Sequence, residues 1–266
     1  MGRVTDRRRV VRVDDARVVE RPDTLAVEEP LEIRADGRPL AVTMRTPGHD
    51  VELALGFLLT EGLVGPDGVH SAINCADNVV DVTLTEPLAD DVAARGFYVS
   101  SSCGICGKAS IDAVTTEQRW PVAGDVFAID ADVLVSLPDK LRAAQKTFDR
   151  TGGLHAAGLF TSTGELLCIR EDVGRHNAVD KVVGWALTET RLPLRGTILQ
   201  VSGRASFELV QKALMAGIPA MAAVSAPSSL AAEMATGAGL TLVGFLRGTS
   251  FNVYADAGRL ALPVSS

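Results

Sequence analysis

Near residue 140 the sequence changes its pattern, and this change limits the folds that are open to the chain. Beyond it, short apolar runs alternate with stretches in which apolar residues recur every three or four positions. Alternating strands and helices of this kind are typical of a layered α/β structure. The predicted strands are 156–160, 166–169, 197–201, 219–224, 240–246 and 251–254, and the predicted helices are 141–148, 178–186, 207–216 and 229–236.

The first half of the chain predicts mostly strands and turns. Alternating stretches punctuated by Asp-Gly and Pro-Gly pairs indicate strands, which we expect at 9–13, 31–33, 40–44 and 79–83. One helix is expected at 51–61, with Leu53, Phe57 and Leu58 on its buried face and Gly62 ending it. Residues 121–124 resemble a linker. We therefore predict two domains: a smaller β-rich domain over 1–130 and an α/β domain over 131–266, so that the chain is α/β, or α+β overall.

Composition excludes several classes of protein. The net charge of −7 argues against a protein that binds nucleic acid through an overall positive surface. The four cysteines, two of them in one motif, do not form a disulfide framework. No run approaches the roughly 18 apolar residues of a membrane span. The basic start, Arg7 to Arg9, is followed by Asp14 and Asp15 rather than by an apolar core, so we expect no signal peptide and a frayed terminus. The cysteine usage favours a reducing cytoplasm.

Four loops that follow predicted strands share glycine, serine and arginine. They are 171–177, 202–206, 225–229 and 247–250. An open α/β sheet binds ligands at the carboxyl ends of its strands. Glycine, serine and arginine before a helix supply backbone N–H groups and positive charge that bind an anion such as a pyrophosphate. The alternative for any single loop is structural, with serines capping helices and Asp172 pairing with Arg175.

A Cys-x-x-Cys motif lies in the loop 100–108. Gly104 and Gly107 free the backbone for turns, and Lys108 together with a helix predicted from Ala109 would favour thiolate. Three interpretations stay open for this motif: a redox dithiol, half of a zinc site, or a nucleophilic sulfur that carries a group. No second ligand pair stands at zinc-finger spacing, and the residues upstream do not form the βαβ setting of a thioredoxin.

Six ordered motifs together resemble the FdhD family of formate dehydrogenase accessory sulfurtransferases. They are Ser-Cys-Gly-Ile-Cys-Gly at 102–107, Thr-Gly-Gly-Leu-His-Ala-Ala at 151–157, Arg-Glu-Asp-Val-Gly-Arg-His-Asn-Ala-Val-Asp-Lys at 170–181, Ser-Gly-Arg-Ala-Ser-Phe-Glu-Leu at 202–209, Gly-Phe-Leu-Arg-Gly at 244–248 and Phe-Asn-Val-Tyr at 251–254. The resemblance implies a cytidine-deaminase-like, three-layer α/β fold in the second half. It also implies a sulfur carrier that accepts sulfur from a cysteine desulfurase and passes it to the molybdenum cofactor, as bis-molybdopterin guanine dinucleotide, for formate dehydrogenase.

The resemblance also implies roles for individual residues. The persulfide falls on Cys103, with Cys106 as the second cysteine of the loop. The guanine-dinucleotide contact falls on Phe245, Leu246, Arg247, Gly248, Thr249 and Ser250. Ligand-orienting roles are expected for Asp172, Arg175, His176 and Lys181. Ligand contacts are expected for Ser202 and Arg204 in the loop 202–206. The family suggests a homodimer, and no resident metal, nucleic acid or membrane is expected.

Two other functions compete with the sulfur carrier. A chaperone that only binds and delivers the cofactor would need the four loops but neither cysteine. A zinc deaminase-like hydrolase would need His-x-Glu and Pro-Cys-x-x-Cys. Here His155 is followed by Ala156 and Ala157, and Ser102 precedes Cys103, so the hydrolase is the weaker hypothesis.

Overall fold

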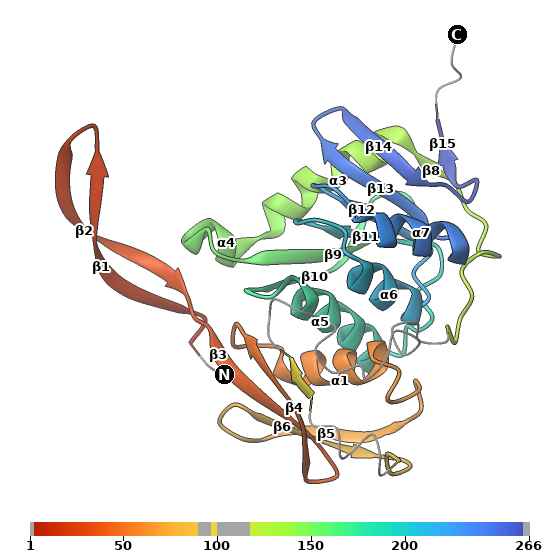
Figure 1. Cartoon of the computed structure of the whole chain (residues 1–266), viewed down its shortest axis with the longest axis horizontal. Coiled ribbons are helices and arrows are strands. Elements are labelled where there is room, and N and C mark those ends of the chain that lie inside the picture. Colours follow the sequence, from red (N-terminus) through yellow and green to blue (C-terminus); the bar gives the residue numbers. More distant parts are fainter. Residues whose placement is uncertain (1–2, 90–96, 100–117, 263–266) are drawn as a thin grey trace.

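The protein is described by a computed structural model that covers residues 3–89, 97–99 and 118–262. Its main body holds two sheets with helices between and around them (Figure 1). The order of the five-stranded sheet is β5 (Val69–Ala76), β6 (Val79–Leu84), β3 (Glu29–Ala35), β4 (Arg38–Arg45) and β7 (Phe97–Val99). The order of the six-stranded sheet is β10 (Leu166–Asp172), β9 (His155–Thr161), β11 (Thr197–Val201), β12 (Ala220–Ala223), β13 (Thr241–Arg247) and β14 (Ser250–Ala255).

The described helices are α1 (Asp50–Thr60), α3 (Ala131–Ala144), α4 (Lys146–Thr151), α5 (Arg175–Thr188), α6 (Phe207–Met215) and α7 (Ser229–Ala238). They lie around the six-stranded sheet, except that α1 packs between α5 and the five-stranded sheet. Val179 of α5 and Val210 of α6 share one buried cluster with Leu199 of β11, while Leu141 of α3 packs with Phe160 of β9 on the other face. The predicted three-layer α/β arrangement is therefore confirmed.

Helices α1 and α5 cross in close contact and join the two sheets. A Cβ added to Gly56 of α1 would lie 1.8 Å from the carbonyl oxygen of Asp180, and one added to Gly184 of α5 would lie 1.8 Å from that of Glu52. Only glycine allows the two backbones to approach so closely. We call this crossing, with the ion pairs around it, the joint.

Buried and half-buried ion pairs surround the crossing. Arg170 of β10 donates to both carboxylate oxygens of Glu52, at 2.7 Å for Nη2 to Oε1. Lys212 lies 2.9 Å from Asp180 and 3.1 Å from Glu61. Burial raises the pKa of Asp180 to about 6, although Lys212 opposes that effect. The polar groups of the joint are thus satisfied inside the protein.

Three expectations of local structure need correction. The helix expected at 141–148 is two helices that meet at Gln145, because the Glu171 carboxylate accepts hydrogen bonds from the backbone N–H groups of Thr147 and Phe148 and caps a new helix there. The expected linker is packed, since Val122 is buried and its carbonyl accepts a hydrogen bond from Arg259. The expected frayed start is instead a hairpin.

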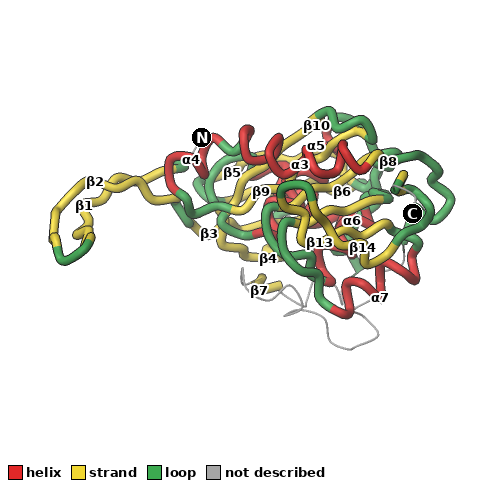
Figure 2. The backbone as a smooth tube through the Cα atoms, turned by 90° about the horizontal axis from the view of Figure 1, so that it is seen from above, coloured by secondary structure: helices red, strands yellow, loops and turns green. Residues whose placement is uncertain are grey.

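That hairpin consists of β1 (Thr5–Asp14) and β2 (Arg17–Ala26) and projects from the body as an arm (Figures 1 and 2). A small parallel pair, β8 (Ile129–Asp130) with β15 (Leu260–Ala261), lies at the far end of the body. The predicted strand 9–13 lies within β1, and a strand is found at every position predicted from residue 31 onward. The predictions 219–224 and 240–246 each start one residue before β12 and β13, and the first also ends one residue late. The domain boundary near residue 130 stays a prediction.

Candidate functional site

The four loops predicted to bind a ligand end at one edge of the six-stranded sheet. Strands β11, β12 and β13 are parallel, and β9 runs antiparallel to both β10 and β11. Strand β10 therefore points the same way as β11, and the carboxyl ends of four strands meet at this edge together with the start of β9. We call it the carboxyl edge. It is where an open α/β sheet binds ligands.

A cavity of about 690 Å³ opens at the carboxyl edge. Its walls come from α3 and α4, from the segment before β9, and from the loops after β11, β12 and β13. The lining residues are Pro138, Asp139, Leu141, Arg142, Gln145, Phe148, Gly152, Gly153, Leu154, His155, Ser202, Val224, Leu246, Arg247 and Gly248. A cavity of this volume is in the range of small-molecule and cofactor sites.

Four residues predicted to contact a ligand line this cavity. They are Ser202, Leu246, Arg247 and Gly248. The Arg247 side chain is exposed, and its Nε donates a hydrogen bond of 2.8 Å to the carbonyl of Val224, which fixes the guanidinium at the rim. Arg142 of α3, which pairs with Asp149 and lies over the Phe148 ring, adds a second guanidinium. Arginine can form two parallel hydrogen bonds with a phosphate, so the rim suits a phosphate-bearing ligand.

The rest of the predicted nucleotide segment lies around the turn between β13 and β14. Phe245 has a φ of 51°, which is uncommon for a bulky residue, and sits in a bulge where the pairing of β13 with β14 shifts between Gly244 and Arg247. Its side chain is 40% exposed while Leu246 is fully buried. Thr249 and Ser250 follow in the exposed turn. The bulge thus presents an aromatic ring to solvent close to the cavity.

Asp172 is the last residue of β10, lies apart from the cavity lining and is fully buried. Its Oδ1 accepts hydrogen bonds from Gly174 N and Asn177 Nδ2, and its Oδ2 accepts one from Thr46 N and pairs with Lys181 Nζ at 2.7 Å. Lys181 also donates to the Thr46 carbonyl at 2.9 Å. These contacts make Asp172 and Lys181 part of the joint, and their ligand-orienting roles stay predictions.

His176 and Glu208 lie together where α5 and α6 begin. His176 Nε2 is 3.9 Å from Glu208 Oε2, and the imidazole is almost fully buried. Burial, with Lys212 and Arg175 nearby, lowers the pKa of His176 to about 3, so the ring is neutral at physiological pH. Arg175 is partly buried and Arg204 exposed, and neither lines the cavity.

Several residues near the site were not predicted from the sequence. Arg142, Gln145 and Phe148 line the cavity because α3 and α4 pass over the sheet edge, which no loop composition could indicate. His155 was considered only as a zinc ligand, although its motif, 151–157, starts with the Gly152-Gly153 pair that also lines the cavity. Burial and the neighbouring Arg175 lower the pKa of His155. Glu208 carried no signal beyond its place in the motif 202–209.

The two cysteines of the predicted persulfide loop, Cys103 and Cys106, lie outside the described residues. Of the other two, Cys75 is exposed and Cys168 is buried, and burial raises the pKa of the Cys168 thiol to about 12. Cys168 is therefore a poor nucleophile. Within the described ranges no three His, Cys, Asp or Glu side chains group as a metal site, and no helix there is long and apolar enough to cross a membrane.

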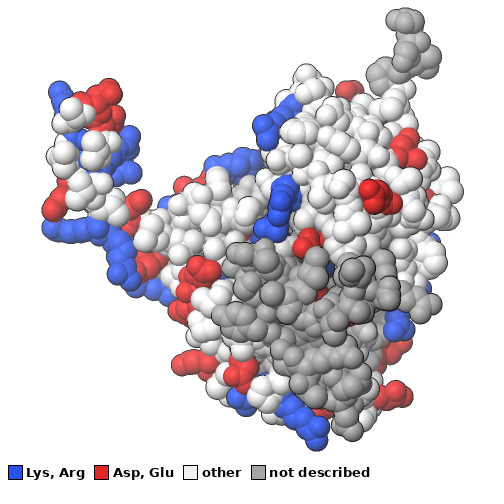
Figure 3. Space-filling model, in the orientation of Figure 1, with Lys and Arg blue, Asp and Glu red and all other residues white. Residues whose placement is uncertain are grey.

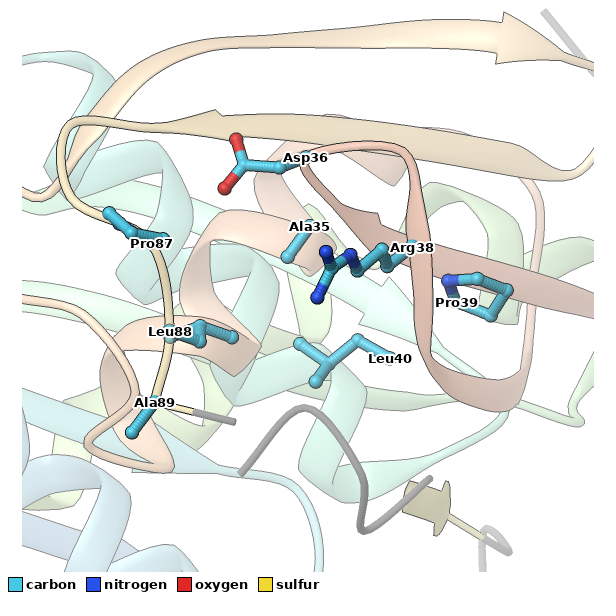
Figure 4. A pocket seen from close by; sticks show the side chains of 8 residues that line it. All are labelled: Ala35, Asp36, Arg38, Pro39, Leu40, Pro87, Leu88 and Ala89. Carbon is cyan, nitrogen blue, oxygen red and sulfur yellow. The ribbon is translucent and has the colours of Figure 1, made fainter. Parts of the chain in front are cut away.

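A second hollow, of about 510 Å³, lies at the edge of the five-stranded sheet (Figure 4). It is lined by Ala35, Asp36, Arg38, Pro39, Leu40, Pro87, Leu88 and Ala89. Figure 4 shows the Arg38 side chain between Leu40 and Asp36. No residue predicted to contact a ligand lines this hollow, which makes it a useful internal control for the cavity at the carboxyl edge.

Comparison with known proteins places these features in a family. The FdhD/NarQ family matches residues 26–261. The sulfur carrier protein FdhD of Streptomyces avermitilis is 60% identical, with 98% of each chain covered, and that of Sulfolobus acidocaldarius is 46% identical, with 96% of this chain and 98% of the relative covered. A crystal structure of a candidate formate dehydrogenase accessory protein from Desulfotalea psychrophila superposes with a TM-score of 0.78 at 23% identity, over 97% of this chain and all of that one. That last likeness concerns the fold alone.

Proposed function

Since this chain belongs to the FdhD/NarQ family, we propose that it is a sulfur carrier for formate dehydrogenase that transfers sulfur through a persulfide on Cys103. A cysteine desulfurase supplies the sulfur. The acceptor is the molybdenum cofactor, in its bis-molybdopterin guanine dinucleotide form, before insertion into the catalytic subunit of formate dehydrogenase. The protein works as a homodimer.

The observation that carries this proposal is the cavity at the carboxyl edge. Its volume of about 690 Å³ and its two rim arginines, Arg142 and Arg247, suit a nucleotide diphosphate. Ser202, a predicted ligand contact, lines it, as does the segment Leu246 to Gly248, which belongs to the predicted guanine-dinucleotide contact. The cavity would hold the nucleotide end of the cofactor while the metal end receives sulfur.

Loading of the carrier is a thiol exchange. The Cys103 thiolate attacks the outer sulfur of the desulfurase persulfide, the S–S bond of that persulfide breaks, and the desulfurase cysteine leaves as thiolate. Cys103 then carries one additional sulfur. No net oxidation or reduction occurs in this step, because one persulfide replaces another.

Release of the sulfur as sulfide needs two electrons, and Cys106 can supply them. The Cys106 thiolate attacks Cys103 Sγ, the bond to the outer sulfur breaks, and that sulfur leaves as sulfide toward the cofactor. This step leaves a disulfide between Cys103 and Cys106, and a cellular dithiol reductant reduces it to the two thiols. In this scheme Cys103 is essential for loading and Cys106 only for release.

Two alternatives are less well supported. A chaperone that binds the cofactor without carrying sulfur would use the same cavity, and only an assay of the cysteines separates it from the carrier. For a zinc deaminase-like hydrolase, the residues that follow His155 are the wrong ones, since Ala156 and Ala157 are buried in β9 and offer no general acid or base.

Intact-mass analysis after incubation with an active cysteine desulfurase and cysteine tests the proposal. The wild type is expected to gain one sulfur, about 32 Da by atomic mass. The gain should persist in Cys106→Ala and vanish in Cys103→Ala.

The other cysteines provide matched controls. Cys75→Ala, which removes an exposed thiol, and Cys168→Ala, which removes a buried thiol with a pKa of about 12, should both load like the wild type. No gain in any form would refute the sulfur carrier and favour the cofactor chaperone. A gain that needs Cys75 rather than Cys103 would refute the assignment of the persulfide.

A further inference from the structure

Helices α3 and α4 supply one wall of the cavity at the carboxyl edge, and this wall differs in chemistry from the strand loops. Its lining positions 138, 141, 142 and 145 recur at helical spacing, so one side of α3 and its C-terminal end face the cavity. Three side chains of this wall can contact a flat polar group. They are the carboxylate of Asp139, the amide of Gln145 and the ring of Phe148.

The side-chain amide of Gln145 is buried without a partner. Gln145 is 3% exposed and lines the cavity. Its backbone N–H donates to the Arg142 carbonyl at 3.2 Å, and its carbonyl accepts from Asp149 N at 3.1 Å. Among the described contacts its side-chain amide has no hydrogen bond. Buried polar groups are rarely left unpaired, so this amide, which can both donate and accept, is available to a ligand.

The carboxylate of Asp139 is also free of a counter-charge. Asp139 is exposed on α3, lines the cavity and forms no ion pair among the described residues. Asp149, by contrast, pairs with Arg142 at 2.5 Å. A carboxylate repels a phosphate and accepts hydrogen bonds from N–H groups. Asp139 therefore suits a part of the ligand that carries N–H donors and not its diphosphate.

Positive charge lies elsewhere around the cavity. Arg247 is fixed at the rim by its hydrogen bond of 2.8 Å to the Val224 carbonyl. Figure 3 shows basic side chains, in blue, on the body between α4 and the turn that joins β13 to β14. A diphosphate fits the side of Arg247. The wall formed by α3 and α4 is thus left for the base of the nucleotide.

We propose that Asp139 and Gln145 select guanine as the base of the bound nucleotide, an inference that rests on the proposed function. Guanine carries two adjacent N–H donors, N1–H and the N2 amino group, next to the acceptor O6. The Asp139 carboxylate accepts hydrogen bonds from both donors, and the Gln145 amide donates to O6. Adenine presents an acceptor at N1, which the carboxylate repels.

Phe148 provides a flat surface for the base without selecting it. The Arg142 guanidinium lies over the Phe148 ring, 4.7 Å from its centroid, and both residues line the cavity. Bases stack on aromatic rings and on guanidinium planes, and every base has such a face. Selection among bases therefore depends on Asp139 and Gln145.

Calorimetric titration of the full chain with guanosine, inosine, adenosine and xanthosine diphosphate tests the proposal. The wild type should bind guanosine diphosphate about tenfold or more tightly than the inosine form, which lacks the N2 amino group, and than the adenosine form. Asp139→Asn should bind guanosine diphosphate about tenfold more weakly. The same variant should bind xanthosine diphosphate more tightly than the wild type does, because the new amide donates to the C2 oxygen of xanthine.

Asp132→Asn is the matched control, since Asp132 is exposed on the same helix and does not line the cavity. It should bind all four diphosphates like the wild type. Gln145→Met keeps the approximate volume of the side chain and removes the amide. It should bind guanosine diphosphate about fivefold more weakly with a free energy of unfolding that is unchanged or higher, because the amide has no partner inside the protein.

Three results would overturn the selection of guanine and leave the sulfur carrier intact. They are equal affinity of the wild type for all four diphosphates, an equal loss for all four in Asp139→Asn, which would place Asp139 at the ribose, and a less stable Gln145→Met, which would make the amide structural. No binding of any diphosphate would overturn this inference together with the nucleotide site. Failure of Cys103 to load sulfur would instead refute the carrier.

Discussion

At the joint, buried charges meet partners inside the protein, whereas at the carboxyl edge the arginines that line the cavity stay exposed. Lys181 is 1% exposed and bonds both Asp172 and the Thr46 carbonyl. The Arg247 side chain donates from Nε to the Val224 carbonyl and reaches the rim of a cavity. Arg247 is the last residue of β13, and Lys181 lies in α5, the helix that follows β10 of the same sheet.

The difference shows that a motif rich in Asp, Arg, His and Lys does not indicate by itself which task it performs. The stretch 170–181 supplies Arg170, Asp172 and Lys181 to the contact with α1 and the loop before it. The stretch 244–248 supplies residues to the cavity. We therefore expect substitutions in the first stretch to change stability and substitutions in the second to change ligand binding.

The largest effect is expected for Lys181→Met. The variant keeps the length of the side chain but leaves the carboxylate of Asp172 buried without its counter-charge. Removing one partner of a buried ion pair costs about 3–5 kcal/mol. Urea unfolding should show a loss of this size in the free energy of unfolding.

Lys146→Met is the matched control, since Lys146 is exposed at the start of α4. It should change the free energy of unfolding by less than about 0.5 kcal/mol. If Lys181→Met is as stable as this control, the joint does not hold the two sheets together in the way described here.

A smaller effect, and one that depends on pH, is expected at the Glu52–Arg170 pair of the joint. Burial alone would raise the pKa of Glu52, but hydrogen bonds from Arg170 and His49 lower it from 4.5 to about 2. The unfolded chain then takes up the proton first as pH falls, so the stabilisation is complete above about pH 5 and is lost between pH 4.5 and 2.

The variant Glu52→Gln removes this ionisation. It should be about 2 kcal/mol less stable than the wild type near pH 6, and the difference should shrink toward zero by about pH 2. Chemical unfolding across this range measures the difference. The exposed Glu165→Gln variant should show none. A difference for Glu52→Gln that does not vary with pH would contradict the ion pair.

Much of the fold could be predicted from the sequence. Periodicity indicated the strands and helices of the second half because each has one strongly apolar face, as in Phe207, Val210 and Leu214 of α6. It could not show the break at Gln145, since the carboxylate that caps the new helix comes from Glu171 on β10. Nor could it show that Gly56 and Gly184 meet, because that contact joins helices 128 positions apart.

The site was predictable in part. Each of the four loops follows a predicted strand, which placed them at the carboxyl ends of the sheet, and Ser202, Leu246, Arg247 and Gly248 do line a cavity there. The contributions of α3 and α4 could not be predicted, because they depend on how these helices cross the sheet. Asp172 was assigned to the site because the loop 171–177 has the composition of a ligand-binding loop. The structure shows that the carboxylate oxygens of Asp172 already have four partners.

Calorimetric titration with guanosine diphosphate, the nucleotide part of the proposed ligand, tests the role of the carboxyl edge most directly. The account predicts that the wild type binds and that Arg247→Ala binds about tenfold more weakly, about 1.4 kcal/mol, with an unchanged free energy of unfolding. Arg38→Ala, in the hollow of Figure 4, should bind like the wild type. No binding by the wild type, or an equal loss in Arg38→Ala and Arg247→Ala, would contradict the assignment of the nucleotide site to the carboxyl edge.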